Sequence, residues 1–362
     1  MNPFPLKPSE IVARARSDLR MGAPVLLRDG ESRRICLAAE PLTAQRFAAM
    51  QSLSDTATQL AITVRRAETL KARAYDGDVA RVIVPPDADA GWVRSVADPA
   101  LDLASPMKGP FRTARDGSAD IARAAIQLAK DARLLPAVLL AALPADCDVS
   151  GITSLDVSTL DHRRSGNSPM HPLVSARVPL MASRAGRVHV FRPEDGGEEH
   201  YAIEIGQPDR STPVLARLHS ACFTGDVLGS LKCDCGPQLR GALQQMGEAG
   251  AGVLLYLNQE GRGIGLANKM RAYALQDQGF DTVAANHRLG FEDDERDFRI
   301  GSDILKRLGF SSVRLMTNNP AKIDMMNAQG VHVVERVPLA LGRTPENDAY
   351  LQVKAEKSGH LF

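Results

Sequence analysis

The second half of the chain alternates between helix-type and strand-type segments, and this alternation limits the possible folds more than any other feature. The helix-type segments are residues 237–250, 263–279, 302–309 and 321–330, and the strand-type segments are residues 252–258, 313–319 and 331–339. Apolar residues recur at three-to-four spacing in the first set and form short continuous runs in the second. Such an alternation indicates parallel β-α-β units, so we predict an α/β fold for this half.

The alternating region is preceded by strand patterns alone. Residues 189–192 and 200–207 flank an acidic, glycine-containing turn, which is typical of two antiparallel strands, and residues 213–220 continue the strand pattern. We therefore expect a mixed sheet in the C-terminal part, beginning with a β-rich segment and flanked by helices.

The length of 362 residues exceeds a typical single core and favours two domains. In the first half, residues 8–19 read as a capped amphipathic helix followed by a strand, and residues 117–135 read as a helix leading into a buried element, so an α+β domain is expected. Polar residues with weak periodicity follow. We predict three parts: a domain at 1–145, a linker at 146–171 and a domain at 172–362.

Charge and hydropathy exclude several classes of partner. Lysine and arginine number 44 against 43 aspartates and glutamates, so no global field draws the chain to nucleic acid or a membrane. No run approaches the roughly 18 apolar residues of a membrane span. The first residues carry prolines and charges where a signal peptide needs an apolar stretch. We expect a cytoplasmic protein that binds any anionic ligand through local charge.

Three of the five cysteines fall within residues 222–235, at Cys222, Cys233 and Cys235. Buried thiols or a chance cluster would be the simplest interpretation, but the neighbouring charged residues and glycine are not typical of a core. A C-x-C pair lets two thiolates converge on one soft cation, and a third completes three corners of a tetrahedron. Three ligands leave one corner for water or substrate, although His219 could close it. The spacing predicts a zinc site with an activated water.

At these residues the chain resembles a known family, GTP cyclohydrolase II, the zinc enzyme that opens the guanine ring of GTP in the first step of riboflavin synthesis. The matching segments are, in order, ARLHSACFTGDVLGSLKCDCGPQL, LNQEGRGIGLANKMRAYALQDQGFDTVAANHRLGF, DERDF, TNNPAK and ERVPL. The resemblance covers about residues 172–362. It implies GTP as the substrate, one zinc ion (Zn²⁺) per chain, Mg²⁺ with the substrate phosphates, and a homodimer.

The resemblance also implies a role for each matching residue. The zinc ligands would be Cys222, Cys233 and Cys235. The nucleotide contacts would be Arg217, Gln238, Glu260, Gly261, Arg262, Thr282, Thr317 and Lys322. Asp294 would be the proton acceptor, Arg296 the nucleophile, and Tyr273 the residue linked to the steps after attack on C8. Because a guanidinium with a pKa above about 12 is a poor nucleophile, we predict that Arg296 clamps the phosphates.

One position departs from the family pattern. Family members commonly read RVHSEC before the first zinc ligand, whereas this chain reads RLHSAC, with Ala221 in place of the acid. An acid beside the metal can orient a water or contact substrate, and alanine cannot. Two alternatives therefore stay open: a non-catalytic GTP-binding regulatory protein, and a variant cyclohydrolase that stops at pyrophosphate release or at the formylated product.

Residues 9–143 show a faint similarity to 3,4-dihydroxy-2-butanone 4-phosphate synthase, a frequent fusion partner of this cyclohydrolase. That synthase holds divalent metals with a RENEGD loop and a GHTE motif, where this chain reads GESRRI and GSADI. No histidine precedes His162. The usual metal site cannot be assembled from these residues. We predict that the N-terminal domain is catalytically silent for the butanone reaction.

Overall fold

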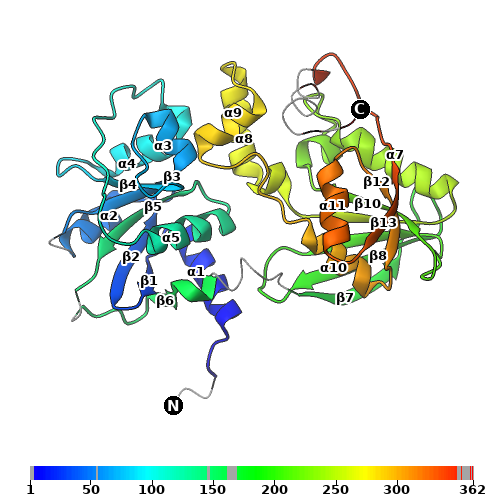
Figure 1. Ribbon diagram of the computed structural model, residues 1–362, viewed down its shortest axis with the longest axis horizontal. Coiled ribbons are helices and arrows are strands. Elements are labelled where there is room, and N and C mark those ends of the chain that lie inside the picture. Colours follow the sequence, from blue (N-terminus) through cyan, green and yellow to red (C-terminus); the bar gives the residue numbers. More distant parts are fainter. Residues whose placement is uncertain are drawn as a thin grey trace. The chain divides into compact units, whose positions relative to one another are not determined.

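The computed structural model divides the chain into two compact units (Figure 1). Unit 1 combines Met1–Gly166 with Ala267–Glu295, and unit 2 combines Asn167–Leu266 with Arg296–Phe362. The structure describes residues 4–53, 56–144, 147–160 and 169–348, together with Gln352, Gly359 and Leu361. Each unit contains its own sheet and core, which confirms the predicted two-domain α/β architecture.

The sheet of unit 1 has six strands in the order β4-β3-β5-β2-β1-β6. Its strands are β1 (Val25–Asp29), β2 (Ser32–Ala38), β3 (Gln59–Thr63), β4 (Val79–Ile83), β5 (Ala137–Ala142) and β6 (Thr153–Asp156). All neighbours are antiparallel except β1 and β6, which run parallel. β1 and β2 form a tight hairpin, because Asp29 pairs with Ser32 across a two-residue turn that begins at Gly30.

The sheet of unit 1 is buried on both faces, since the adjacent β1 residues Leu26 and Leu27 point to opposite sides and both are buried. The helices of unit 1 are α1 (Pro8–Arg20), α2 (Ala44–Ser52), α3 (Val64–Leu70), α4 (Ala90–Ala97), α5 (Asp120–Asp131), α8 (Leu266–Asp277) and α9 (Thr282–Leu289). Every second residue of β1 points the same way, so Val25 and Leu27 pack in one core with Leu19 of α1 and Leu128 of α5. The predicted helices at 8–19 and 117–135 are present, and the helix at Thr282–Leu289 was not predicted.

The sheet of unit 2 has seven strands in the order β13-β12-β10-β11-β9-β8-β7. Its strands are β7 (Met170–Arg177), β8 (Gly186–Pro193), β9 (His200–Ile205), β10 (Val214–Ser220), β11 (Gly252–Leu257), β12 (Ser312–Met316) and β13 (His332–Val337). The four strands from β13 to β11 are parallel, and β9, β8 and β7 continue antiparallel. The predicted mixed sheet with a β-rich beginning is therefore confirmed.

Helices cover both faces of the unit 2 sheet, and alternation along β10 decides what each face receives. Its even-numbered residues pack with α10 (Arg299–Arg307) and α11 (Pro320–Ala328), as Leu218 does. Its odd-numbered residues face α7 (Cys235–Glu248), as Leu215 does. Arg217 shares the odd face and therefore lies toward α7.

The two compact units differ from the predicted three-part division of the chain in two places. The stretch at 146–171 contains β6, and its Leu155 and Leu160 are buried in the core of unit 1. A four-residue strand is too short to show a periodicity, which is why the sequence indicated a linker; residues 161–168 lie outside the described ranges. The second difference is Ala267–Glu295, which lies inside the predicted 172–362 domain yet belongs to unit 1.

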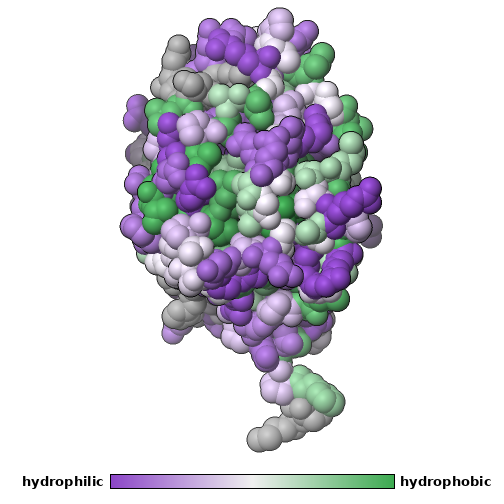
Figure 2. Space-filling view, turned by 90° about the vertical axis from the view of Figure 1, so that its right-hand side faces the viewer, coloured by the Kyte–Doolittle hydropathy of each residue, from purple (hydrophilic) through white to green (hydrophobic). Residues whose placement is uncertain are grey.

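The surface mixes residue types. Figure 2 shows one face of the molecule, on which hydrophobic residues lie in separate groups among hydrophilic ones. Within the described ranges, the helices are all too short or too polar to cross a lipid bilayer.

Candidate active site

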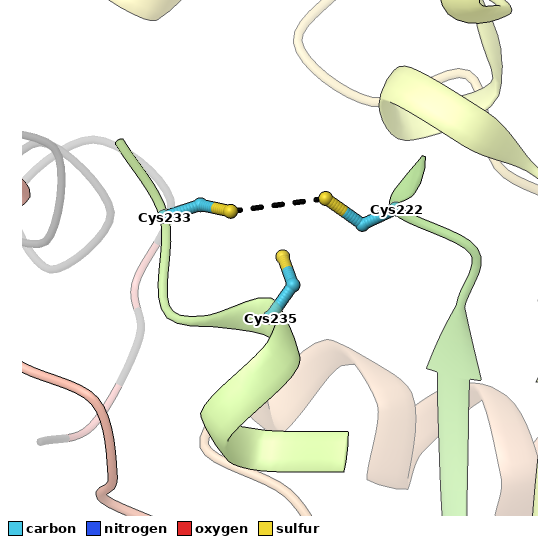
Figure 3. Close-up of side chains that lie close together, drawn as sticks. All are labelled: Cys222, Cys233 and Cys235. Atoms are coloured by element: carbon cyan, nitrogen blue, oxygen red, sulfur yellow. Dashed lines mark hydrogen bonds between the residues drawn. The ribbon is translucent and has the colours of Figure 1, made fainter. Parts of the chain in front are cut away.

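Three thiols converge at one edge of unit 2 (Figure 3). Cys222 lies two residues after the end of β10, Cys235 is the first residue of α7, and Cys233 lies in the loop before it. Their sulfur atoms all lie within 4.8 Å of one another, and the Sγ atoms of Cys222 and Cys233 are 3.7 Å apart. Cys222 and Cys233 are buried and Cys235 is half-buried. The predicted cluster is thus brought together.

The spacing of the sulfurs fits a metal ion. Zinc–sulfur bonds of about 2.3 Å in a tetrahedron place neighbouring sulfurs about 3.8 Å apart, close to the distance between Cys222 and Cys233. Thiolates are also the donors that soft cations prefer. Within the described ranges, this is the only group in which ligand atoms of three or more Cys, His or acidic residues lie this close together.

Gly225 packs directly against this cluster. It lies in a short helical turn, η2 (Phe223–Val227), whose amide at Gly225 donates to the Sγ of Cys222 at 3.4 Å. A Cβ on Gly225 would lie 2.8 Å from the Sγ of Cys233 and 3.1 Å from the Sγ of Cys222. Only glycine leaves room for both sulfurs, which explains why the loop between the cysteines carries one here.

Asp226 holds the backbone next to the first thiol. Its carboxylate accepts hydrogen bonds from the amide of Cys222 and from the hydroxyl of Tyr256, both at 3.0 Å. The Nε2 of His219 lies 3.0 Å from the same carboxylate, and its ring stacks on Tyr256. Burial lowers the pKa of His219. His219 therefore contacts Asp226 rather than the thiols and helps to position the loop.

Asp226 and Tyr256 were missed by the sequence analysis. A carboxylate four residues after the first ligand and a tyrosine inside an otherwise apolar strand are the only signals that could have indicated them. Burial, and next the nearby Asp226 carboxylate, raise the pKa of Tyr256, so its hydroxyl stays a hydrogen-bond donor.

Arg217 is a buried cation beside the thiols. Its Nη1 donates to the carbonyl of Met316 at 3.1 Å, and its Nη2 donates to the side chain of Gln238, whose amide donates in turn to Asp234. Burial lowers the pKa of Arg217 to about 10, against the opposing effect of Asp234 and Cys235. Its Nε is buried and has no hydrogen-bond partner among the described residues.

Glu260 lies on the other side of the first ligand, in η3 (Glu260–Gly263). Its Oε2 accepts a hydrogen bond from the amide of Phe223 at 2.6 Å, and its Oε1 accepts one from Gly261 at 3.0 Å. Gly261 and Arg262 both have φ near +60°, in the left-handed region. That conformation costs a non-glycine residue roughly 1–2 kcal/mol, so the strain at Arg262 is typical of a functional turn.

Two further cations flank one aromatic ring. The Nζ of Lys322 donates to the carbonyl of Leu218 at 3.0 Å, and the Nη1 of Arg296 donates to the hydroxyl of Ser220 at 3.3 Å. Both cationic groups lie 4.7 Å from the ring centre of Phe298. Thr317 is buried at the end of β12, where its hydroxyl accepts a hydrogen bond from Asn319 at 3.0 Å. These groups gather at the carboxyl ends of the parallel strands β10 and β12, the usual binding edge of such a sheet.

Three predicted site residues lie in unit 1 instead. Tyr273 is on α8, Thr282 begins α9, and Asp294 is exposed in the loop that follows. The hydroxyl of Thr282 accepts a hydrogen bond from Gln276 at 3.1 Å. The other predicted residues belong to unit 2.

Three thiols next to buried cations, at the carboxyl edge of a parallel sheet, define an α/β protein that can hold a soft cation beside an anionic ligand. Residues 173–338 match the family model described as GTP cyclohydrolase II. GTP cyclohydrolase-2 from Azospirillum brasilense is 43% identical over 364 residues, covering 97% of this chain and 94% of that protein. The chain belongs to the GTP cyclohydrolase II family, which consists of hydrolases.

Shorter relatives match the second half alone. GTP cyclohydrolase-2 from Shigella boydii is 59% identical over 166 residues, which are 46% of this chain and 85% of that protein. The same enzyme from Escherichia coli matches with the same identity and coverage.

Solved structures align more weakly. RibBX from A. baumannii, described as a two-domain 3,4-dihydroxy-2-butanone 4-phosphate synthase, covers 90% of this chain and 99% of its own at 14% identity and a TM-score of 0.32. A cation-free 3,4-dihydroxy-2-butanone 4-phosphate synthase covers 42% of this chain and 96% of its own at 16% identity and a TM-score of 0.33. Scores this low do not establish a common fold, and the similarity of unit 1 to that synthase stays a prediction from its sequence.

Proposed function

We propose that this protein is a zinc-dependent GTP cyclohydrolase II, which converts GTP into 2,5-diamino-6-(5-phosphoribosylamino)pyrimidin-4-one, formate and pyrophosphate. The observation that carries the proposal is the convergence of three thiol sulfurs within 4.8 Å, inside the segment that matches the family. The names of the relatives support the activity. The reaction would be the first step of riboflavin synthesis and would take place in the cytoplasm.

Ring opening at C8 of guanine needs an activated water and a group that accepts developing charge. Cys222, Cys233 and Cys235 would hold the zinc ion, which would supply the Lewis acidity that activates water. Glu260 is the group that would recognise guanine, because its carboxylate lies beside the first ligand and can accept from the N1 and 2-amino hydrogens. Gln238 is engaged at both ends of its amide, so we assign it the orientation of Arg217.

The triphosphate would be held by the cations of unit 2. The chain has nearly equal numbers of acidic and basic residues, so binding depends on cations that are focused at one edge. Arg296 and Lys322 flank Phe298 there, and Arg217 and Arg262 supply further donors. Mg²⁺, held by the substrate phosphates, would supply further positive charge to the triphosphate. In this scheme Arg296 acts as a clamp.

Proton transfer would fall to two residues of unit 1. Asp294 is an exposed carboxylate two residues before Arg296, and it would accept a proton during phosphate chemistry. Tyr273 would donate or orient a proton in the hydrolysis that releases formate. Thr282 would contact the nucleotide.

Unit 1 would be silent in the butanone reaction. The stretch GESRRI, which stands where that synthase carries its acidic metal loop, forms the turn after β1 and the first part of β2. A homodimer is part of the proposal, supported by the edge strand β7, on which Val174 is 64% exposed.

The deciding experiment incubates the zinc-loaded protein with GTP and Mg²⁺ and measures formate and pyrophosphate separately. We expect both products in equal amounts, with loss of the guanine absorbance. GTP binding without either product would support the non-catalytic regulatory alternative. Pyrophosphate alone would indicate a pyrophosphohydrolase, and pyrophosphate with ring opening but no formate would indicate an enzyme that stops at the formylated product.

Restoring the acid before the first ligand is a second test. Ala221 is half-buried and its amide donates to the carbonyl of Leu257 at 2.8 Å, so its side chain is fixed next to Cys222. We expect Ala221→Glu to raise the rate of formate release about tenfold, because outer groups tune metal-bound ligands by 10–100-fold. Ala221→Gln is the uncharged control. A fall in rate for the glutamate variant would show that the site has adapted to alanine.

A further inference from the structure

The segment Ala267–Glu295, here called the arm, carries three of the proposed site residues, and it packs within unit 1 rather than unit 2. It lies inside the family match at 173–338 and contains Tyr273, Thr282 and Asp294. It nevertheless belongs to unit 1, where α9 packs against α3. The first 166 residues therefore supply the surface on which this part of the cyclohydrolase segment folds.

The turn after α9 packs closely against that surface and is hydrogen-bonded to it. The carbonyl of Gly290 accepts a buried hydrogen bond from the hydroxyl of Thr63 at 2.8 Å. Gly290 has φ +90°, and a Cβ there would lie 2.9 Å from both Thr63 and Pro136. The next residue, Phe291, is 1% exposed. The approach is so close that only glycine fits.

The start of α8 is held in a similar way. Asn268 is fully buried and donates to the carbonyl of Arg133 at 3.3 Å. Arg271 makes ion pairs with Glu40 at 3.2 Å and with Asp98 at 3.4 Å. Both ends of the arm are therefore tied to residues that precede the cyclohydrolase segment.

The loop at the end of the arm is held by ion pairs with Lys130 and Arg65. Glu295 accepts from the Nζ of Lys130, on α5, at 2.5 Å and from the amide of Glu292 at 3.0 Å. Glu292 in turn accepts from the guanidinium of Arg65 at 2.9 and 3.1 Å. The Lys130 and Glu295 side chains are only 17% and 22% exposed, so solvent screens this pair less than a surface pair. Glu295 lies directly between Asp294 and Arg296 in the chain.

We propose that Lys130 is a positioning residue for the cyclohydrolase reaction, and that unit 1 serves that reaction by holding the arm and its terminal loop in place. This inference rests on the proposed function. Catalytic groups must be held within about 0.5 Å of their productive geometry, and a shift of 1 Å can cost about 100-fold in rate. A salt bridge to Glu295 would restrain the loop that carries the preceding residue, Asp294.

The lengths of the relatives indicate that the role proposed for Lys130 is specific to family members that contain an N-terminal domain. In the Shigella boydii enzyme the 166 matched residues make up 85% of the protein, so about 30 residues remain outside the match. Such a chain has no room for a counterpart of Met1–Gly166. The contact through Lys130 is thus available only to long members of the family such as this one.

A charge swap in the full-length zinc-loaded protein tests the proposal. We expect Lys130→Glu to lower kcat for formate and pyrophosphate release by about tenfold or more, with KM for GTP and zinc content within about threefold of wild type. Glu295→Lys should do the same, and the double variant should recover kcat to within about threefold. Hydrogen exchange at residues 290–296 should be faster in each single variant and slow again in the double variant. If Lys130→Glu does not fold, Lys130→Ala is measured in its place.

The control is Arg123→Glu, on the same helix α5. Arg123 pairs with Asp78 at 2.9 Å and contacts no residue of the arm through a described ion pair or hydrogen bond. It should leave kcat and exchange of the arm unchanged. Equal losses in the control and in Lys130→Glu, or unchanged kcat in Lys130→Glu, would overturn the proposal. If wild-type protein releases neither product, the proposed function fails by itself, while the exchange measurements still decide whether Lys130 holds the loop.

Discussion

Replacing Cys233 with serine is expected to remove the zinc and to abolish formate release, with a fall of at least about 1,000-fold. Serine keeps the shape of the side chain but offers a hydroxyl, a poor ligand for a soft cation compared with a thiolate. Two thiols would remain, and a site with two ligands does not retain its metal. Zinc content measured by elemental analysis and formate release from GTP together check this prediction. Pyrophosphate release should persist, because the cations at Arg296 and Lys322 do not depend on the thiols.

Cys147→Ser is the matched control for this experiment. Cys147 is a free, half-buried cysteine in unit 1, outside the cluster, and its replacement should leave zinc content and both products unchanged. Cys36 is less suitable, because it is buried in the core and burial raises its pKa to about 12. A Cys233→Ser protein that keeps one zinc per chain and releases formate at the wild-type rate would refute the metal site.

The sequence was sufficient for the parts of the structure that depend on local pattern. The helix–strand alternation after residue 237 predicted the parallel strands β11, β12 and β13, because each element carries its own periodicity. The close spacing of Cys222, Cys233 and Cys235 predicted the cluster, because residues this near in sequence can meet without knowledge of the rest of the fold.

The sequence was insufficient where partners are distant in the chain. Lys130 and Glu295 are separated by 165 positions, and Thr63 and Gly290 by 227, so neither pair leaves a local signal. Helix α8 buries Asn268 and Lys269 together with Ala272 and Leu275, so its apolar pattern does not indicate which unit it packs in, and chain continuity alone led to its assignment to the C-terminal domain. Asp226 was overlooked for the same reason, because its partner Tyr256 is 30 residues away.

Removing the carboxylate of Asp226 should lower both the stability of unit 2 and its affinity for zinc. The side chain is only 3% exposed and accepts hydrogen bonds from the Cys222 amide and the Tyr256 hydroxyl, with the His219 ring beside it. Each buried group left without its partner costs about 1–3 kcal/mol, so Asp226→Ala should lose about 3 kcal/mol or more of unfolding free energy. At roughly 2–4 °C per kcal/mol, the melting temperature of the apo protein should fall by about 6 °C or more.

The same substitution should also act on the metal, because the amide of Cys222 would lose the acceptor that fixes the first ligand. We expect zinc affinity to fall by about 10–100-fold, the range seen when outer-shell partners are removed. Thermal unfolding of the apo protein and competition with a zinc chelator separate the two effects. Asp209→Ala is the control in the same unit, since Asp209 is an exposed acceptor in the turn at Ser211 and should change neither quantity. An Asp226→Ala protein that melts with wild type would mean that water replaces the carboxylate and that His219 and Tyr256 do not depend on it.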